Sequence, residues 1–102
     1  MTTGRTAAAQ ILVTGIVQMV GYRMWTTRTA RGLGLCGFVR NLHDGRVEIH
    51  AEGEASSIDQ LVTQCWRGPT DARVDDVTRV AKAPRGATAF VEVADAAAPE
   101  AS

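Results

Sequence analysis

The segment Cys36–Gly53 reads CGFVRNLHDGRVEIHAEG and predicts a β-hairpin. Two extended stretches, Cys36–Asn41 and Arg46–Gly53, are joined through the residues HDG at 43–45, and Asp-Gly between alternating segments is a strong hairpin signal. The apolar residues that alternate with polar ones in the second stretch are Val47, Ile49 and Ala51. They define one apolar face, so His50 falls on the opposite face, where we expect it to be exposed.

A helix is predicted on each side of this hairpin. Upstream, Tyr22–Leu33 places apolar and small side chains on one face, and Gly34 follows in the position of a left-handed C-terminal cap. Downstream, Ser57–Arg67 carries an apolar stripe and ends before Gly68-Pro69. Two capping boxes are available for the start of this second helix: Ser56 with Asp59, or Ser57 with Gln60.

One strand is predicted before the first helix and another after the second. Gln10–Val17 reads as the first strand, and a less regular strand carries valines at 74, 77 and 80. After a turn at Pro-Arg-Gly, Thr88–Ala94 gives a last short strand. The order β-α-β-β-α-β predicts an α+β ferredoxin-like sandwich, an antiparallel sheet with two helices on one face.

Length and composition indicate one domain. The chain has 102 residues and a formal net charge of zero, so its total charge does not indicate a polyanionic partner. We expect a frayed N-terminus at 1–8, the domain at 9–94 and a flexible tail at 95–102. The sequence lacks a signal peptide, a membrane-spanning stretch and the aromatic signature of RNA-binding sheets. These features predict a cytoplasmic monomer that binds neither membrane nor nucleic acid, with Cys36 and Cys65 as reduced thiols.

The loop before the first helix has an unusual charge. In GIVQMVGYR, Gly15–Arg23, an arginine occupies the first turn of the helix, where a cation is disfavoured by about 0.3–1 kcal/mol. Residues 1–43 contain five arginines and no Asp or Glu. A phosphate held by the loop N–H groups, the helix start and the Arg23 guanidinium would make this arrangement favourable. The other arginines, including Arg31 and Arg40, read as solvated charges or as a field that attracts anions.

The sequence resembles the acylphosphatase family over about residues 10–93. The family's first motif usually reads Gly-x-Val-Gln-Gly-Val-x-Phe/Tyr-Arg, and GIVQMVGYR matches it at every defined position but Met19. Its second motif reads Gly-Phe/Trp-Val-x-Asn before an Asp-Gly or similar turn, and GFVRN followed by LHDG matches that. The resemblance implies a small ferredoxin-like hydrolase that cleaves acyl phosphates to a carboxylate and inorganic phosphate, without a metal or other cofactor.

The resemblance also implies roles for individual residues. The family's phosphate-binding arginine falls on Arg23, and its water-positioning asparagine falls on Asn41. Its phosphate-binding loop falls on Gly15, Ile16, Val17, Gln18, Met19 and Val20. The chemistry suits these residue types, because the carboxylate leaving group has a conjugate acid with a pKa near 4 and needs no protonating side chain. Asn41 is not a base at neutral pH, so we expect the substrate's phosphate to accept the proton from the water.

Two departures from the family pattern leave an alternative open. Met19 stands where glycine is usual, which costs about 1–2 kcal/mol if that position needs a positive φ, and Ile16 stands where a basic residue is frequent. The alternative is a catalytically weak module of the same fold that binds phosphate without useful turnover. His43, at the hairpin tip, is a second potential base, although turn-tip histidines are usually solvated.

Overall fold

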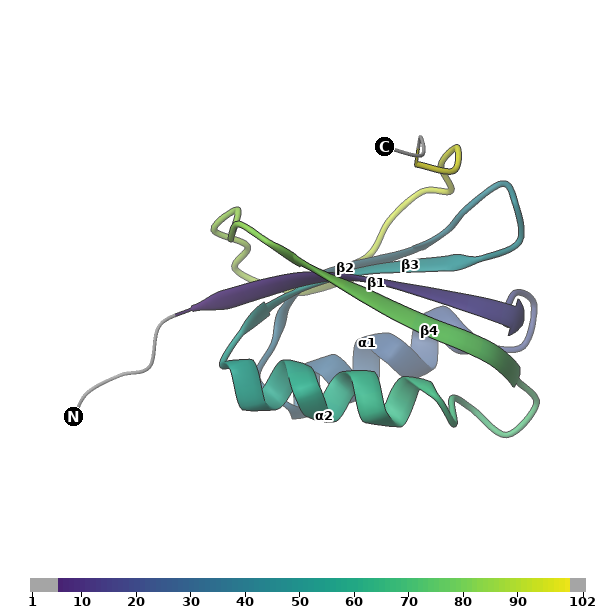
Figure 1. Cartoon of the computed structure of the whole chain (residues 1–102), viewed down its shortest axis with the longest axis horizontal. Helices are drawn as coiled ribbons and strands as arrows, with labels where there is room; N and C mark the ends of the chain where they lie inside the picture. Colours follow the sequence, from purple (N-terminus) through teal and green to yellow (C-terminus); the bar gives the residue numbers. More distant parts are fainter. Residues whose placement is uncertain (1–5, 100–102) are drawn as a thin grey trace.

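Two helices cover one face of a five-stranded sheet in the computed structural model, which describes residues 6–99 (Figure 1). The helix layer and the sheet enclose the core, as expected for a ferredoxin-like α+β fold. The elements in chain order are β1 (Ala7–Ile16), α1 (Tyr22–Gly32), β2 (Cys36–Asn41), β3 (Val47–Gly53), α2 (Ala55–Cys65), β4 (Arg73–Lys82) and β5 (Phe90–Glu92). The predicted fold class is confirmed.

The strand order is β4-β1-β3-β2-β5, and the first three of its four pairings, β4 with β1, β1 with β3 and β3 with β2, are antiparallel. The prediction of a wholly antiparallel sheet is wrong at one edge, since β5 pairs with β2 in parallel through Gly37 and Phe90. The physical reason is the connection after β4. Residues 83–89 run from one edge of the sheet to the other, so β5 arrives beside β2 pointing the same way. We call residues 83–89 the strap.

The structure confirms the predicted C-terminal cap of α1 but not the predicted N-terminal cap of α2. At the end of α1, Gly34 has a φ of 74° and the Leu35 N–H donates to the Ala30 carbonyl at 2.9 Å, so the predicted left-handed cap is confirmed. The capping boxes predicted for the second helix are wrong. It begins at Ala55 with Glu54 as N-cap and no side-chain cap, because a start two residues earlier places both serines inside the first turn.

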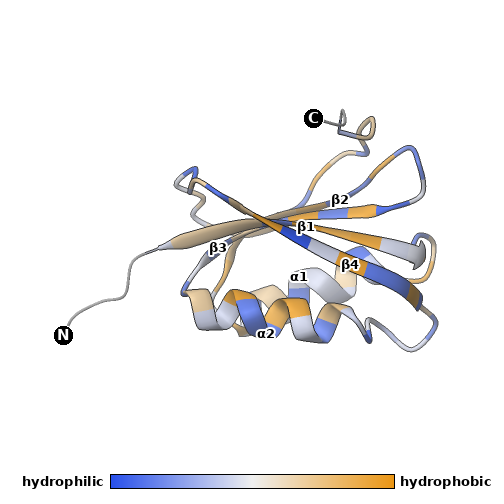
Figure 2. Cartoon of the chain, viewed as in Figure 1, coloured by the Kyte–Doolittle hydropathy of each residue, from blue (hydrophilic) through white to orange (hydrophobic). Residues whose placement is uncertain are grey.

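The core lies between the helices and the sheet. Alternate strand residues and one stripe of α2 are buried, and Figure 2 shows hydrophobic and hydrophilic residues alternating around α2. The largest fully buried aliphatic side chains include Ile11, Val13, Ile49, Ile58 and Leu61. These positions follow the strand and helix periods, because each element turns one face towards the other layer.

The opposite face of the sheet is more buried than predicted. His50 is only 3% exposed, so the expectation of an exposed histidine is wrong. The ring of Phe38 stacks on it with centroids 5.5 Å apart, and its Nε2 lies 2.6 Å from the Glu52 carboxylate. Glu52 also accepts hydrogen bonds from three backbone N–H groups of the strap, at Arg85, Gly86 and Ala87. The strap therefore covers part of this face.

Two arginines expected in solvent also have internal partners. The Arg40 Nε donates to the Glu48 carboxylate at 2.6 Å, and its guanidinium lies 5.1 Å from the centre of the Phe38 ring. Arg31 donates through Nε and one terminal nitrogen to the Phe90 carbonyl, at 3.1 and 2.9 Å. These contacts fix β2 to β3 and β5 to α1.

The predicted segment boundaries shift at both ends. The first strand begins at Ala7, earlier than predicted, because Ala8 and Ala9 pair with both neighbouring strands; the rest of the expected frayed terminus, residues 1–5, lies outside the described residues. In the expected tail, Ala96 exchanges backbone hydrogen bonds with Asn41 and His43, while residues 100–102 lie outside the description. Cys36 and Cys65 are free cysteines. No helix within residues 6–99 has the length and apolar character to cross a membrane.

Candidate active site

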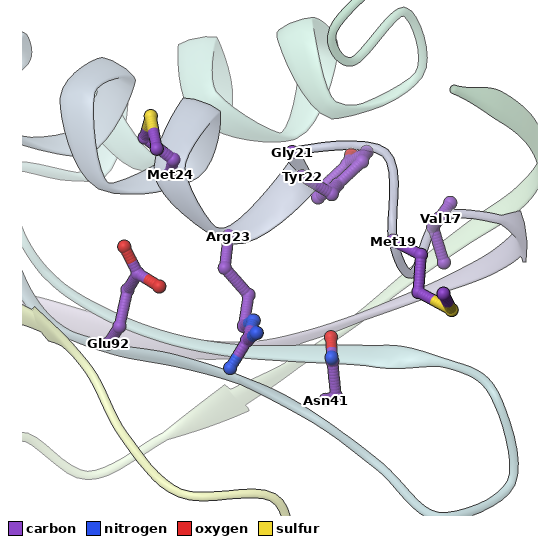
Figure 3. Close-up of a pocket in the computed structure, with 8 residues that line it drawn as sticks. All are labelled: Val17, Met19, Gly21, Tyr22, Arg23, Met24, Asn41 and Glu92. Atoms are coloured by element: carbon purple, nitrogen blue, oxygen red, sulfur yellow. The ribbon is translucent and has the colours of Figure 1, made fainter. Parts of the chain in front are cut away.

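A small cavity of about 160 Å³ opens where the loop after β1 meets the start of α1, the end of β2 and β5 (Figure 3). The residues that line it are Val17, Met19, Gly21, Tyr22, Arg23, Met24, Asn41 and Glu92. Arg23 and Asn41, the two residues to which the resemblance assigns chemistry, come from different elements and both line this cavity. In Figure 3 the Arg23 guanidinium extends from α1 towards β2, beside the Asn41 carboxamide.

The first glycine of the loop motif has a role in the sheet. Gly15 lies within β1 at a register shift, with a φ of 134°. A Cβ on this residue would lie 2.1 Å from the Arg73 carbonyl oxygen, so β1 and β4 approach too closely there for any side chain. Gly15 and its neighbour Ile16 do not line the cavity.

The loop that follows turns through two left-handed positions. Met19 has a φ of 63° and Gly21 a φ of 81°; Met19 is the sole non-glycine residue with positive φ among the described residues. Alternation of left-handed and right-handed positions turns successive backbone N–H groups inward, as in anion-binding nests. The Gln18 side chain anchors the loop, because its Nε2 donates to the carbonyls of Leu42 and Arg46 at 2.8 and 2.9 Å.

The first turn of α1 supplies no acidic side chain of its own. Gly21 is the N-cap, it makes no side-chain cap hydrogen bond, and the first turn contains no acidic residue. The early N–H groups of a helix have no partners within the helix, so at this end they are available to an acceptor in the cavity. Arg23 adds a guanidinium that is 39% exposed and makes a loose ion pair with Asp95 at 3.6 Å. This corner is arranged for an anion from outside the chain.

Asn41 faces the same cavity from the end of β2. The residue is 8% exposed, and its buried Oδ1 has no hydrogen-bond partner among residues 6–99. A buried carbonyl oxygen without a partner is costly and is rarely left so in native proteins. A water or ligand in the cavity would satisfy it. Its backbone carbonyl is used elsewhere, accepting from the Ala96 N–H at 3.1 Å, so the side chain is the group presented to the site.

Tyr22 supports the helix start from behind. It is 1% exposed, and its hydroxyl donates to the Cys65 carbonyl at 2.7 Å. Burial raises the pKa of the Tyr22 hydroxyl well above its usual range, with smaller contributions from Cys65. Burial also raises the pKa of the Cys65 thiol, to about 12. Both groups are therefore neutral near pH 7, and the hydrogen bond from the Tyr22 hydroxyl to the Cys65 carbonyl ties α1 to α2.

The predicted site residues fall into two groups. Arg23, Asn41, Val17 and Met19 line the cavity, whereas four other residues of the predicted loop do not: Gly15, Ile16, Gln18 and Val20. His43 is exposed at the hairpin tip and does not line it either. Sequence reasoning missed four lining residues, which are Gly21, Tyr22, Met24 and Glu92, and it missed Asp95 as the partner of Arg23. Met24 could have been predicted, because it lies next to Arg23 in the first turn of the helix. Glu92 and Asp95 could not, because they reach the site through the parallel pairing of β5 with β2.

Comparison with known proteins identifies the family. The family model described as acylphosphatase matches residues 9–91. The chain belongs to the acylphosphatase family. The match includes both Arg23 and Asn41 and ends just before Glu92.

Individual relatives of this acylphosphatase-family chain agree with that result. It is 54% identical over 71 residues to an acylphosphatase of Anaeromyxobacter sp., covering 70% of this chain and 76% of the relative. An acylphosphatase of Methylococcus capsulatus is 58% identical over 64 residues, with 63% and 70% covered. The solved acylphosphatase of Coxiella burnetii is 33% identical and superposes with a TM-score of 0.84 over 86% of this chain and 93% of that one.

Proposed function

We propose that the loop of residues 17–21, the start of α1 and Arg23 bind the phosphoryl group of an acyl phosphate, and that Asn41 orients the attacking water. Hydrolysis of acyl phosphates follows from membership in the acylphosphatase family. The observation that supports the individual roles is the convergence of the Arg23 guanidinium and the unpartnered Asn41 Oδ1 on one cavity with an uncapped helix start. The expected partners are a small-molecule acyl phosphate and the phosphate ion, and we expect a monomer.

Each group contributes to a different part of the barrier. Phosphoryl transfer spreads negative charge over three equatorial oxygens, and catalysis consists largely of positioning and electrostatic stabilisation. Arg23 and the loop N–H groups stabilise that charge, and one well-aimed donor is typically worth about 10²–10³ in rate. Asn41 holds the water in line with the departing acyl oxygen, which is a contribution of orientation.

The reaction needs neither a protein acid nor a protein base in this scheme. The acyl oxygen leaves as a carboxylate, and the substrate's phosphate takes the proton of the water. Both histidines lie away from the cavity: His43 is at the hairpin tip, and His50 is on the opposite face of the sheet. We propose that no metal is required.

The alternative, a phosphate-binding module with little turnover, is not favoured. Its basis was a methionine in place of the usual glycine, and Met19 does adopt the left-handed conformation. Several relatives at 44–58% identity are named acylphosphatase, which supports turnover. The strain at Met19 therefore affects the rate of turnover and the stability of the loop, but not the class of reaction.

Benzoyl phosphate hydrolysis by the wild type and Asn41→Ala, with a chelator present, tests the proposal. We expect kcat to fall about 10²–10³-fold in the variant, while inhibition by inorganic phosphate changes less than threefold because Arg23 and the loop remain. The Asn41 backbone contact with Ala96 is kept, so the fold should not change. Loss of phosphate binding in Asn41→Ala, or a requirement for added metal, would contradict the assigned roles.

A further inference from the structure

A second cavity lies on the face of the sheet that the helices leave uncovered. It has a volume of about 350 Å³ and is bounded by β2, β3, β5 and the strap, whereas the cavity beside Arg23 has about 160 Å³. Its lining includes Phe38, His50, Glu52, Arg85, Val91 and Val93. Among residues 6–99, no residue lines both cavities. We call this second space the strap cavity.

Alternation along the last strand separates the two cavities. Glu92 lines the cavity beside Arg23, whereas its neighbours Val91 and Val93 line the strap cavity, because successive side chains of an extended segment point to opposite faces. The volume of the strap cavity lies within the range of small-molecule sites, about 300–1,000 Å³. The fold therefore offers a second concave site that the hydrolysis does not use.

Hydrogen bonds at both ends of the strap hold the walls of this cavity in place. At one end, Glu52 accepts from three backbone N–H groups of the strap. At the other end, the Gly37 N–H donates to the Ala89 carbonyl at 2.9 Å. The cavity is therefore formed before any ligand arrives, which lowers the entropy cost of binding.

The charges of the strap cavity favour an anion. Glu52 is 3% exposed, and its carboxylate is already paired with His50 Nε2 and the strap N–H groups. The side chain of Arg85 is exposed, and no ion pair joins it to an acid within residues 6–99. Its guanidinium lies 5.8 Å from the centre of the Phe38 ring. An anion at this guanidinium would gain a cation without meeting an unpaired carboxylate.

We propose that the strap cavity binds a small organic carboxylate, with its carboxylate at Arg85 and its apolar body against Phe38, Val91 and Val93. A single guanidinium matches one carboxylate in its planar, two-oxygen geometry. The apolar lining requires a ligand with a hydrophobic part, which inorganic phosphate lacks. An aromatic body suits the site best, because the Phe38 ring already stacks on His50 and offers an aromatic surface.

This site goes beyond the proposed function, since its ligand binds on the other face of the sheet. Hydrolysis of an acyl phosphate releases a carboxylate, so the enzyme's own product belongs to the proposed ligand class. The probe is therefore benzoate, the product expected from benzoyl phosphate.

The first test is a benzoate titration of the wild type, followed by backbone amide NMR with the cavity beside Arg23 filled by saturating inorganic phosphate. We expect saturable shifts at Ala87, Ala89 and Val91, and none of similar size in the loop of residues 17–21. Benzamide keeps the ring without the charge, and acetate keeps the charge without the ring; each should bind about tenfold more weakly than benzoate. Shifts confined to the loop, no saturable shifts in the strap, or equal binding of benzamide would overturn the proposal.

Arg85→Gln tests the cation. The Arg85 backbone N–H still donates to Glu52 in this variant, so the strap should keep its position. We expect benzoate affinity to fall about tenfold and benzamide affinity to change less than twofold. Arg67→Gln is the matched control, because it removes an exposed guanidinium that follows α2, on the other side of the sheet. Equal benzoate affinity in the Arg85 and Arg67 variants would contradict the assigned role of Arg85.

Val91→Ala tests the apolar wall. The loss of two methyl groups should weaken benzoate and benzamide alike, about threefold. Val80→Ala is the control, since Val80 is similarly exposed, at 52% against 42%, but lies on β4. Unchanged benzoate affinity in a folded Val91→Ala variant would place the ring elsewhere and overturn the proposed pose. None of these titrations involves hydrolysis, so their outcome does not depend on the roles proposed for Arg23 and Asn41.

Discussion

Two loops of this protein expose backbone N–H groups to a negative charge, and they differ in where that charge comes from. In the strap, the N–H groups of Arg85, Gly86 and Ala87 donate to Glu52, a carboxylate of the protein's own central strand. At the loop of residues 17–21 and the start of α1, no side chain caps the helix and no acid lies in its first turn. The strap N–H groups have an acceptor within the protein, whereas we expect those of the loop before α1 to bind an acceptor on the substrate.

The comparison teaches what separates a structural anion from a site. Glu52 is 3% exposed and binds the strap to the sheet, so its contacts contribute to stability. Arg23 is partly exposed and forms a loose ion pair with Asp95, so its side chain contributes little to stability and can bind a phosphoryl group. Substitutions in the first region should affect folding, and substitutions in the second should affect turnover.

Arg23→Gln should have the largest effect. We expect kcat/KM for benzoyl phosphate to fall about 10³-fold, because the charge on the phosphoryl oxygens loses its guanidinium, while the urea midpoint stays within the range of a surface substitution. Arg28→Gln, which removes the same charge from an exposed position of α1, should change kcat/KM less than threefold. Equal effects of the two variants would contradict a specific role for Arg23.

Glu52→Ala should lower stability and leave activity nearly unchanged, the reverse of what we expect for Arg23→Gln. Three backbone N–H groups and His50 lose a charged acceptor in a buried place, so we expect a loss of about 3 kcal/mol in the free energy of unfolding, or a fall of about 15 °C in Tm. Activity per folded molecule should stay within threefold. Glu54→Ala, which removes an exposed acid whose side chain makes no cap hydrogen bond, is the control. A loss below about 1 kcal/mol would show that the strap does not depend on Glu52.

Acid should weaken the strap through the same carboxylate. Burial raises the pKa of Glu52, but hydrogen bonds from His50 and the strap N–H groups outweigh it and hold the pKa below its usual 4.5. Because the folded-state pKa is the lower one, this contribution to stability is present above about pH 4.5 and is lost as the pH falls through the folded-state pKa. Urea unfolding from about pH 6 to about pH 3 should show a smaller acid loss in Glu52→Gln than in the wild type. Parallel curves would assign the acid loss to other groups.

Met19→Gly should have the smallest effect and the opposite sign. Glycine removes about 1–2 kcal/mol of left-handed strain but adds about 0.5–1 kcal/mol of backbone entropy to the unfolded chain. We expect a net gain of about 0.5 kcal/mol in the free energy of unfolding, measured by urea titration. Met19→Ala keeps the strain and should leave the midpoint unchanged. A loss of stability in Met19→Gly would mean that the methionine side chain stabilises the folded loop.

Local pattern predicted much of the fold. The segment Cys36–Asn41 is a strand with the predicted bounds, because alternation and an Asp-Gly turn are local properties of the chain. The helix end at Gly34 was predictable for the same reason, since only glycine takes a left-handed cap without strain. The start of α2 was not predictable, because two competing caps were available and the fold used neither.

The site was predictable only as a set of residues. The loop motif, Arg23 and Asn41 were marked by the resemblance and by the odd placement of a cation at a helix start. Their convergence on one cavity depends on packing α1 across the end of β2, which no local pattern specifies. Glu92 and Asp95 were missed because β5 reaches that edge only after the strap has crossed the sheet.

The sequence by itself determined the alternation of strands and helices, the hairpin and the residue types able to handle a phosphoryl group, because periodicity, turn chemistry and charge act over a few residues. Only the tertiary structure decided that His50 is buried, that β5 runs parallel to β2, and that Asn41 presents an unpartnered oxygen beside Arg23. Those outcomes depend on which surfaces meet. Burial and hydrogen-bond pairing depend on contacts between segments that lie far apart in the chain and meet only when the helices pack against the sheet.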